Sequence, residues 1–228
     1  LGDVYKRQAK DEINGVNITG TTVNLDGAIY TGGTGNTIDI TGAVTLGGNT
    51  IIDSSTSGGN ITITGAVTGT RDLDILSGSG LATITGNIGT GGTPLASLDI
   101  NASNTAGHTG GVTLGGNIGT DSAAGSALTT LGNPKTTGTI TLSGVEYNTS
   151  DDQAFTAAAF ALGGANVTFA TSSDPVDFTV SAAGGGDVTL ADAANLTINT
   201  VAGNITFGGD ILGTDNGEST SVTLNTTG

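Results

Sequence analysis

The chain contains no cysteine, no methionine and no tryptophan among its 228 residues. Without cysteine it can form no disulfide, no thiol nucleophile and no cysteine-ligated zinc site. Methionine is missing even at the first position, and there is neither a charged-then-apolar leader nor an apolar run of about 18 residues. We therefore expect an internal piece of a longer protein, and we expect no membrane insertion of this piece.

Basic residues are scarce, because 5 Lys and Arg stand against 20 Asp and Glu, for a formal net charge of −15. So few cations cannot neutralise a row of phosphates, which excludes nucleic acid as an expected partner. No lysine follows a glycine, so the sequence contains no P-loop. The acidic residues are spread along the chain, which is typical of a soluble, self-repelling surface.

Glycine and small apolar residues are what the chain has in abundance. It contains 41 glycines, and 35% of its residues are hydrophobic although only 4% are aromatic. Most of the hydrophobic residues are valine, isoleucine, leucine and alanine, which are enough for a narrow core. The composition therefore favours a folded chain over a disordered one.

The first residues differ from everything that follows. The octet LGDVYKRQ matches nothing downstream and carries two of the five basic residues. It resembles the translation of a sequencing adapter read through at the end of an assembled metagenomic fragment; the alternative is a native non-repetitive segment. We therefore divide the chain into a non-repetitive leader, residues 1–10, and a repeat array, residues 11–228, incomplete at both ends.

A short phrase recurs through the array: an apolar residue, then a small or hydroxyl residue, then glycine. Its first residue is found at Ile18, Ile40, Ile63, Ile84, Leu114, Leu142 and Phe207. The first six lie 22, 23, 21, 30 and 28 residues apart. A drifting period in the low twenties is the size of one coil of a β-solenoid.

The strand signal inside each unit is a triplet of apolar, polar and apolar residues. Threonine is central in Ile61–Ile63 and Val112–Leu114, whereas aspartate is central in Ile38–Ile40, Leu73–Ile75 and Leu98–Ile100. Alternation with a period of two points the apolar residues inward and the threonine or aspartate outward. Connectors of Gly, Asn, Asp and Ser suit tight corners.

Two all-β folds suit this pattern. A β-solenoid with coils of about 20–30 residues stacks equivalent positions on themselves, so near-identical units favour it. At about 4.8 Å per coil, roughly ten coils would make a rod about 50 Å long. The alternative is a set of β-sandwich repeats, because the strand spacing from Val167 to Phe207 also fits that fold. The stretch Ala154 to Leu162 fits either a short helix or an alanine-rich strand pair.

Four phrases also suggest a family. GNIGTGGTPLASLDI at residues 86–100, YNTSDDQAFTA at 147–157, ANLTI at 194–198 and GNITFGGDILGT at 203–214 resemble the repeats of very large bacterial surface exoproteins. These include filamentous-haemagglutinin-like two-partner-secretion proteins, autotransporter-type adhesins and β-strand-repeat proteins. The resemblance implies a right-handed parallel β-helix exported to the cell surface, where such repeats serve in adhesion or matrix building. It implies host or matrix glycans or proteins, and neighbouring repeats of the same chain, as partners.

Catalytic candidates are few. His108, the sole histidine, lies among small turn residues, and we interpret it as a solvated loop residue because nothing in the sequence supplies its partners. Pectin-type hydrolases on β-helices combine clustered aspartates with a GHG segment and a later Arg-x-Lys. Here Asp151 and Asp152 follow the histidine, and no basic residue comes after Lys135. Both the order and the content of that pattern are broken, so we predict no catalytic residues and no enzyme activity.

Calcium is the one cofactor that the acidic residues suggest. Gly32 to Ile40 approaches a calcium-binding nonapeptide, but Thr37 occupies the position of the ligand aspartate. Asp210, Asp215 and Glu218 could gather carboxylate oxygens at one loop. Their spacing fits no defined calcium loop, so ordinary aspartate turns are the alternative, and we otherwise expect no cofactor.

Asparagine is abundant in Asn-x-Ser/Thr form. Because it so often precedes an apolar-threonine strand, we interpret most of these residues as strand-entry positions and only weakly as glycan sites. They include Asn17, Asn60, Asn101, Asn148, Asn166, Asn195, Asn204 and Asn225.

The sequence thus predicts a non-enzymatic structural or adhesive module of a secreted or cell-surface protein, located outside the bacterial cell. The alternative is a carbohydrate-active β-helix enzyme or a tailspike-like depolymerase. An enzyme should gather Asp or Glu from adjacent coils in one cleft, whereas a scaffold should show threonine and asparagine ladders. Two long steps between anchors predict extruded loops at Gly89–Ser97 and Thr120–Leu128, the places where we expect any binding.

Overall fold

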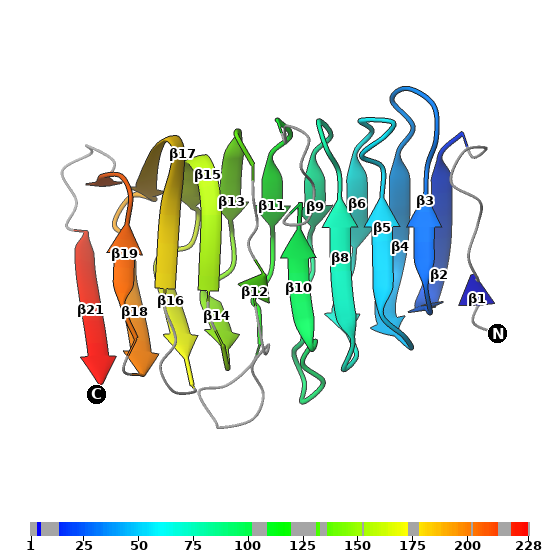
Figure 1. Ribbon diagram of the computed structural model, residues 1–228. Coiled ribbons are helices and arrows are strands. Elements are labelled where there is room, and N and C mark those ends of the chain that lie inside the picture. The colour runs from blue at the N-terminus through cyan, green and yellow to red at the C-terminus, as the bar shows by residue number, and fades with distance from the viewer. Residues whose placement is uncertain are drawn as a thin grey trace.

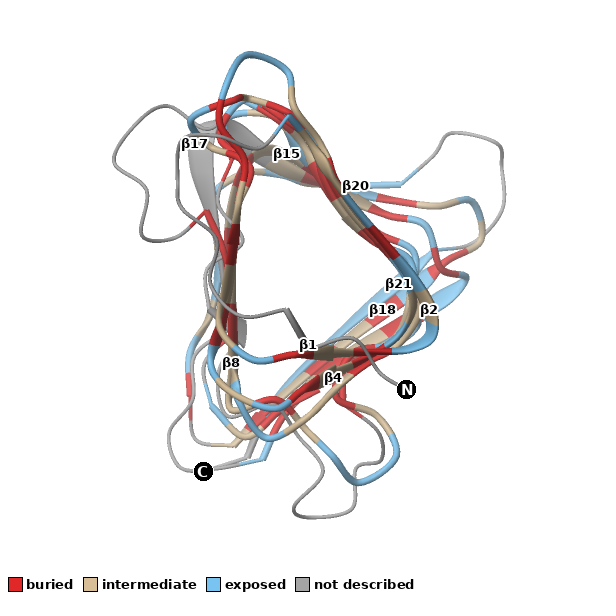
Figure 2. Ribbon diagram, turned by 90° about the vertical axis from the view of Figure 1, so that its right-hand side faces the viewer, coloured by how far each residue is buried: buried red, intermediate tan, exposed pale blue. Residues whose placement is uncertain are grey.

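The computed structural model describes residues 4–5, 14–101, 109–119, 131–132, 136–151, 153–172, 178–201, 203–213 and 220–227. Over these residues the chain is a parallel β-helix of about seven turns, with strands and no helix. Successive turns lie side by side along one axis from the N-terminus to the C-terminus (Figure 1). Seen along that axis, the coil has a triangular outline (Figure 2).

Each turn contributes to three faces. The first face comprises part of β2 (Val16–Leu25) and β4 (Ile38–Leu46), then β6 (Ile61–Thr64), β9 (Ala82–Ile84), β11 (Val112–Leu114), β13 (Thr139–Leu142), the ends of β15 (Gln153–Leu162) and β17 (Phe178–Leu190), and β20 (Ile211–Leu212). The second comprises β1 (Val4–Tyr5), the ends of β2 and β4, then β7 (Val67–Thr68), β14 (Glu146–Thr149), β16 (Asn166–Thr171), β18 (Asn195–Val201) and β21 (Ser221–Thr227). The third comprises β3 (Ala28–Tyr30), β5 (Thr50–Asp53), β8 (Asp72–Leu76), β10 (Ser97–Ile100), β12 (Leu131–Gly132), the beginnings of β15 and β17, and β19 (Ile205–Phe207).

Every pairing between these strands is parallel, as stacking of successive turns requires. A β-sandwich is built from antiparallel pairs, so the sandwich alternative is wrong for the described residues. The stretch from Val167 to Phe207, whose spacing suited a sandwich, instead distributes β16 to β19 over different faces of consecutive turns.

The recurring phrase marks one position of the turn. Ile18, Ile40, Ile63, Ile84, Leu114 and Leu142 are consecutive partners on the first face, so the six anchors are confirmed as one stack. Phe207 is the exception, because it pairs with Val180 on the third face. On more than one face a strand is followed by glycine, so the recurring phrase alone does not identify the face on which it lies. For this reason, and because some turns are long, there are fewer turns than the expected ten.

Alternation along each strand sets the core. Ile61 and Ile63 are fully buried, whereas Thr62 between them is partly exposed and Thr64 is exposed. The same order holds at β9 and β11, so the predicted inward and outward sides are confirmed there. Burying one isoleucine or valine in each strand position stabilises the stack by about 1.5–3 kcal/mol per side chain.

Glycine is required where the first face meets the second. A Cβ on Gly42 would lie 1.9 Å from the carbonyl oxygen of Gly20, and a Cβ on Gly65 would lie 2.2 Å from that of Gly42. Both glycines also have positive φ angles, 132° and 136°. The backbones of successive turns therefore touch at this corner, which explains why glycine ends the recurring phrase.

The alanine-rich stretch from Ala154 to Leu162 is a strand. It lies within β15, which runs from the third face to the first with a register shift between Ala157 and Ala159. Phe155 and Phe160 from this strand pack with Phe169 of β16, with ring centroids 5.0 Å and 5.9 Å apart for the two pairs that include Phe155. The strand alternative is therefore confirmed.

Candidate functional site

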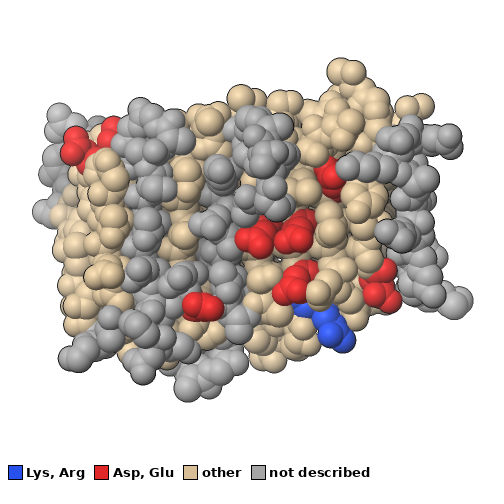
Figure 3. Space-filling view, in the orientation of Figure 1, with Lys and Arg blue, Asp and Glu red and all other residues tan. Residues whose placement is uncertain are grey.

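Three aspartates gather on the third face, in the turns of β8 and β10. Asp74 of β8 is the partner of Asp99 of β10, and Asp72 is the partner of Ser97. Neighbouring parallel strands lie about 4.8 Å apart, so Asp74 and Asp99 project side by side from adjacent turns. Figure 3 shows acidic side chains grouped over β8 and β10 on this face. This acidic group is the strongest candidate site among the described residues.

Neighbouring polar side chains hold Asp72 in place. The Ser97 hydroxyl donates a hydrogen bond to Asp72 Oδ1 over 2.8 Å, and the Asn49 amide donates one to Asp72 Oδ2 over 2.7 Å. Asn49 belongs to the turn before and Ser97 to the turn after, so the carboxylate links three turns. Its charge is therefore held at a fixed place beside Asp74 and Asp99.

Burial and mutual repulsion shift two of these carboxyls. Burial raises the pKa of Asp74 above its usual value, and the charges of Asp99 and Asp72 raise that pKa further. Burial, followed by the charge of Asp72, likewise raises the pKa of Asp99. Asp74 and Asp99 on this face therefore bind protons more readily than free aspartate does.

An enzyme should bring carboxyls from adjacent turns together and place them in a cleft, and the acidic group meets only the first of these conditions. It brings carboxyls from adjacent turns together, but they lie on the side of a sheet and no described cleft is lined by them. A hydrolase needs both carboxyls to flank a bound bond. His108 and Asp152 lie outside the described residues, and Asp151 is exposed.

The predicted calcium ligands are not brought together by the described residues. Asp210 is exposed, and its backbone N–H donates a hydrogen bond to Asp187 Oδ1 over 3.0 Å. Asp215 and Glu218 lie outside the described residues. In the described part of the chain no group of three or more His, Cys, Asp or Glu side chains could hold a metal ion. Calcium binding at this loop stays a prediction.

Ladders of asparagine run along the outside of the coil. Asn195 donates to Asn166 over 2.7 Å, and Asn225 donates to Asn199 over 2.8 Å. At the corner between the first and second faces, Asn117 Oδ1 accepts from the backbone N–H of Val145 over 2.8 Å. Such ladders link successive turns, and asparagine ladders are the feature expected of a scaffold.

The strand-entry interpretation of asparagine holds at four of the eight positions, whereas Asn17, Asn148 and Asn225 lie inside β2, β14 and β21. Asn60 and Asn204 directly precede β6 and β19, and Asn166 and Asn195 are the first residues of β16 and β18. Asn101 differs, because it follows β10, is fully buried and has a φ of 59°. Its Oδ1 accepts hydrogen bonds from the backbone of the preceding turn, so this residue closes a turn.

The first predicted loop is extruded, but less completely than the sequence indicated. Gly89 N–H donates to Val67 and Ala96 N–H donates to Arg71, so the ladder is intact on both sides of residues 90–95. The tip from Gly91 to Thr93 is exposed. Leu95 is buried and packs with the core, which a composition of small and polar residues did not reveal. The second predicted loop, Thr120–Leu128, lies outside the described residues.

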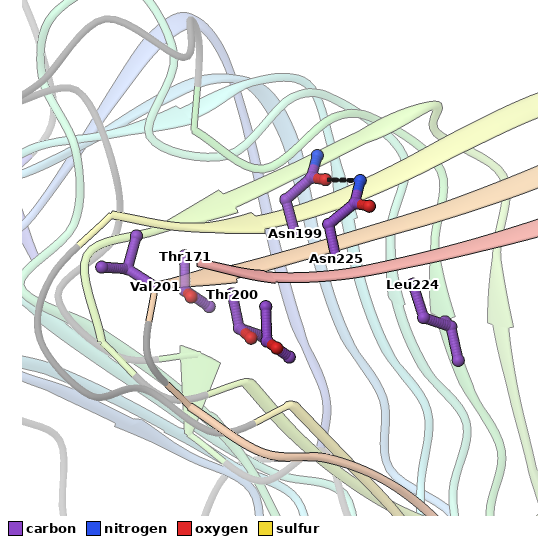
Figure 4. A pocket seen from close by; sticks show the side chains of 7 residues that line it. Thr171, Asn199, Thr200, Val201, Leu224 and Asn225 are labelled. Carbon is purple, nitrogen blue, oxygen red and sulfur yellow. Dashed lines mark hydrogen bonds between the residues drawn. The ribbon is translucent and has the colours of Figure 1, made fainter. Parts of the chain in front are cut away.

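A hollow of about 500 Å³ lies at the C-terminal end of the second face. Figure 4 shows the side chains that line it, which come from β16, β18 and β21. They are Thr171, Asn199, Thr200, Val201, Leu224, Asn225 and Thr226. The lining contains neither charged nor aromatic side chains, unlike most sites for organic ligands.

No protein-family model, no curated protein and no solved structure matches this chain. Among the described residues there is no helix of the length and hydrophobicity needed to cross a membrane.

The sequence located part of the acidic group. The triplets Leu73–Ile75 and Leu98–Ile100 were predicted to give an acidic outer face, and both lie in register on the third face. The third such triplet, Ile38–Ile40, lies on the first face instead. Asp72 was missed, because its place beside the pair depends on the register of β8 with β10. Aligning DLDI with SLDI would have revealed that register.

Proposed function

We propose that this chain is a non-enzymatic structural and adhesive repeat module of a secreted or cell-surface protein, in which a β-solenoid holds binding loops away from the cell. The observation that carries the proposal is the loop at residues 90–95, which leaves the coil while the backbone ladder continues on both sides of it. A scaffold of this kind can vary its loops without changing its stack, because lengthening a surface loop costs little entropy.

The absence of charged or aromatic lining in the described hollow supports the same proposal, since it favours binding through exposed loops and faces. The loop at residues 90–95 offers only a small exposed tip, Gly91 to Thr93, so a single contact would be weak. Many turns in one chain, or many chains on one surface, would add such contacts into useful avidity. Glycans or matrix proteins are the partners that this geometry suits.

The test replaces residues 90–95 with the Gly69-Thr70 dipeptide that fills the equivalent corner of the preceding turn. Beads that carry many copies of the chain are exposed to a printed glycan array and to immobilised matrix proteins. We expect the unaltered chain to bind at least one of them and the shortened chain to bind it several-fold less, with circular dichroism showing retained strands. Beads that bind nothing would contradict adhesion, and unchanged binding by the shortened chain would contradict the role of this loop.

One observation favours a second candidate, a carbohydrate-active enzyme. Asp74 and Asp99 lie side by side on adjacent turns, and burial raises the pKa of each. A carboxyl with a raised pKa can serve as a general acid. Release of reducing ends from acidic or neutral polysaccharides, abolished by Asp74→Asn, would support this candidate over the scaffold.

A further inference from the structure

Two buried polar atoms without hydrogen-bond partners lie in the region where β15 meets β14 and β16. Gln153 is fully buried and its Oε1 has no hydrogen-bond partner, and Thr171 is only 5% exposed and its Oγ1 has none either. Buried polar atoms in folded proteins are nearly always paired with protein groups or with ordered water. An unpaired pair of this kind therefore identifies a place for a ligand.

The orientation of the Gln153 amide follows from its neighbours. Its Nε2 lies 3.0 Å from the carbonyl oxygen of Tyr147, 3.0 Å from Thr149 Oγ1 and 2.9 Å from the carbonyl oxygen of Ala170. Carbonyl oxygens can only accept, so the NH₂ group must face them and cannot exchange places with Oε1. The oxygen is thus directed away from these acceptors and needs a donor.

Thr171 adjoins the same amide. It is the partner of Thr149, whose hydroxyl contacts Gln153, and it directly follows Ala170, whose carbonyl accepts from Gln153. Thr171 also lines the hollow at the C-terminal end of the second face. In Figure 4 the side chains of Thr171 and Thr200 lie next to each other along this hollow. Thr171 therefore adjoins residues that contact the buried amide and also lines the hollow of about 500 Å³.

We propose that this corner is a binding site for an ordered water molecule, which donates a hydrogen bond to Gln153 Oε1 and forms a second one with Thr171 Oγ1. A molecule there must be small, neutral and able to donate, because the site is buried and its known partner is an acceptor. Water meets all three conditions and can enter from the hollow, where most lining residues are polar. The solenoid is thereby hydrated inside one corner, beside the aromatic side chains of Tyr147 and Phe169.

The test compares Thr171→Val with Thr168→Val. Valine has nearly the shape of threonine but no hydroxyl, and Thr168 lies on the same strand with its side chain only partly buried, so the second variant measures the effect of the exchange itself. If Thr171 holds water that also serves Gln153, its loss leaves Gln153 Oε1 without a donor. We expect Tm to fall by about 2–4 °C in Thr171→Val relative to Thr168→Val.

A rise in Tm for Thr171→Val relative to Thr168→Val would overturn the proposal, because removing an unpaired hydroxyl from a dry site stabilises the fold. A crystal structure of the unaltered chain at high resolution gives an independent answer if the variant does not fold. Density for one water within hydrogen-bonding distance of both Gln153 Oε1 and Thr171 Oγ1 supports the site. A corner without that density overturns it.

Discussion

At the scale of single residues, glycine at the corner between the first and second faces does what no other residue can. Gly42 and Gly65 follow the same strand in consecutive turns, and a Cβ on either would collide with the carbonyl oxygen of the glycine one turn before. Gly65 also has a φ of 136°, outside the range that residues with a Cβ adopt readily. Glycine is therefore a requirement of stacking at this corner.

We expect Gly65→Ala to lower the free energy of unfolding by at least about 3 kcal/mol, because a steric clash with Gly42 adds to the backbone strain. Gly35→Ala is the matched control: its φ is 75°, but a Cβ there meets no atom within 4 Å. It should cost only about 1–2 kcal/mol, the cost of the left-handed backbone alone. Urea unfolding measures both, and equal losses would show that the close approach of turns at Gly65 contributes nothing.

At the scale of strands, electrostatic repulsion on the third face lowers the stability of the fold. β8 and β10 place Asp72, Asp74 and Asp99 together, and burial with mutual repulsion raises the pKa of Asp74 and of Asp99. A carboxyl whose pKa is raised in the folded state binds protons more tightly there than in the unfolded chain. Stability from these two groups is therefore present below the ordinary pKa of 3.8 and is lost as pH rises through the raised values.

We expect Asp99→Asn to raise Tm at pH 7, because it removes one charge from the group and its amide can donate to Asp74. The gain should shrink as pH falls toward 3.8, where the carboxyls of the unaltered chain are protonated as well. Thermal unfolding monitored by circular dichroism from pH 3 to pH 7 measures both effects. Asp26→Asn, at an exposed position, removes the same charge elsewhere and should change Tm little. A lower Tm for Asp99→Asn at pH 7 would contradict net repulsion among these aspartates and would indicate that they bind a cation together.

At the scale of the whole molecule, the β-helix is a column of nearly equivalent turns. Ile38 and Asp39 of one turn pair with Ile61 and Thr62 of the next, and these pair in turn with Ala82 and Thr83. Stability in such a column is close to a sum over turns and the interfaces between neighbouring turns. A whole turn should therefore be removable, whereas part of a turn should not.

We expect deletion of residues 61–81 to leave a folded β-helix that is one turn shorter. Asn60 would then continue into Ala82, and each strand of one turn would meet its equivalent in the next. Deletion of residues 61–71 is the control, because it joins Asn60 to a strand of the third face and removes the two preceding faces of that turn. Circular dichroism and dispersion of amide NMR signals should show native order in the first variant and its loss in the second. Loss of order in both would mean that the turns are not interchangeable.

The sequence by itself determined the fold class, the period of the turn and the inward side of the strands. These properties are local and repeated: the alternation in Ile61–Ile63 points the same residues inward in every turn, and repetition from Ile18 to Leu142 leaves stacking as its physical cause. The extrusion of residues 90–95 could also be predicted from the sequence, because the step between the anchors on either side of it is longer than most.

Only the tertiary structure decided which residues meet across turns. Phe207 carries the recurring phrase but lies on the third face, Leu95 belongs to a polar loop but is buried, and Asp72 joins Asp74 and Asp99. Gln153 and Thr171 likewise form a polar corner that no motif announces. Contacts of this kind depend on the register between strands that are 20 or more residues apart, and insertions of different length shift that register from turn to turn. The local pattern is the same in each case, so the pattern alone cannot tell which neighbour a residue has.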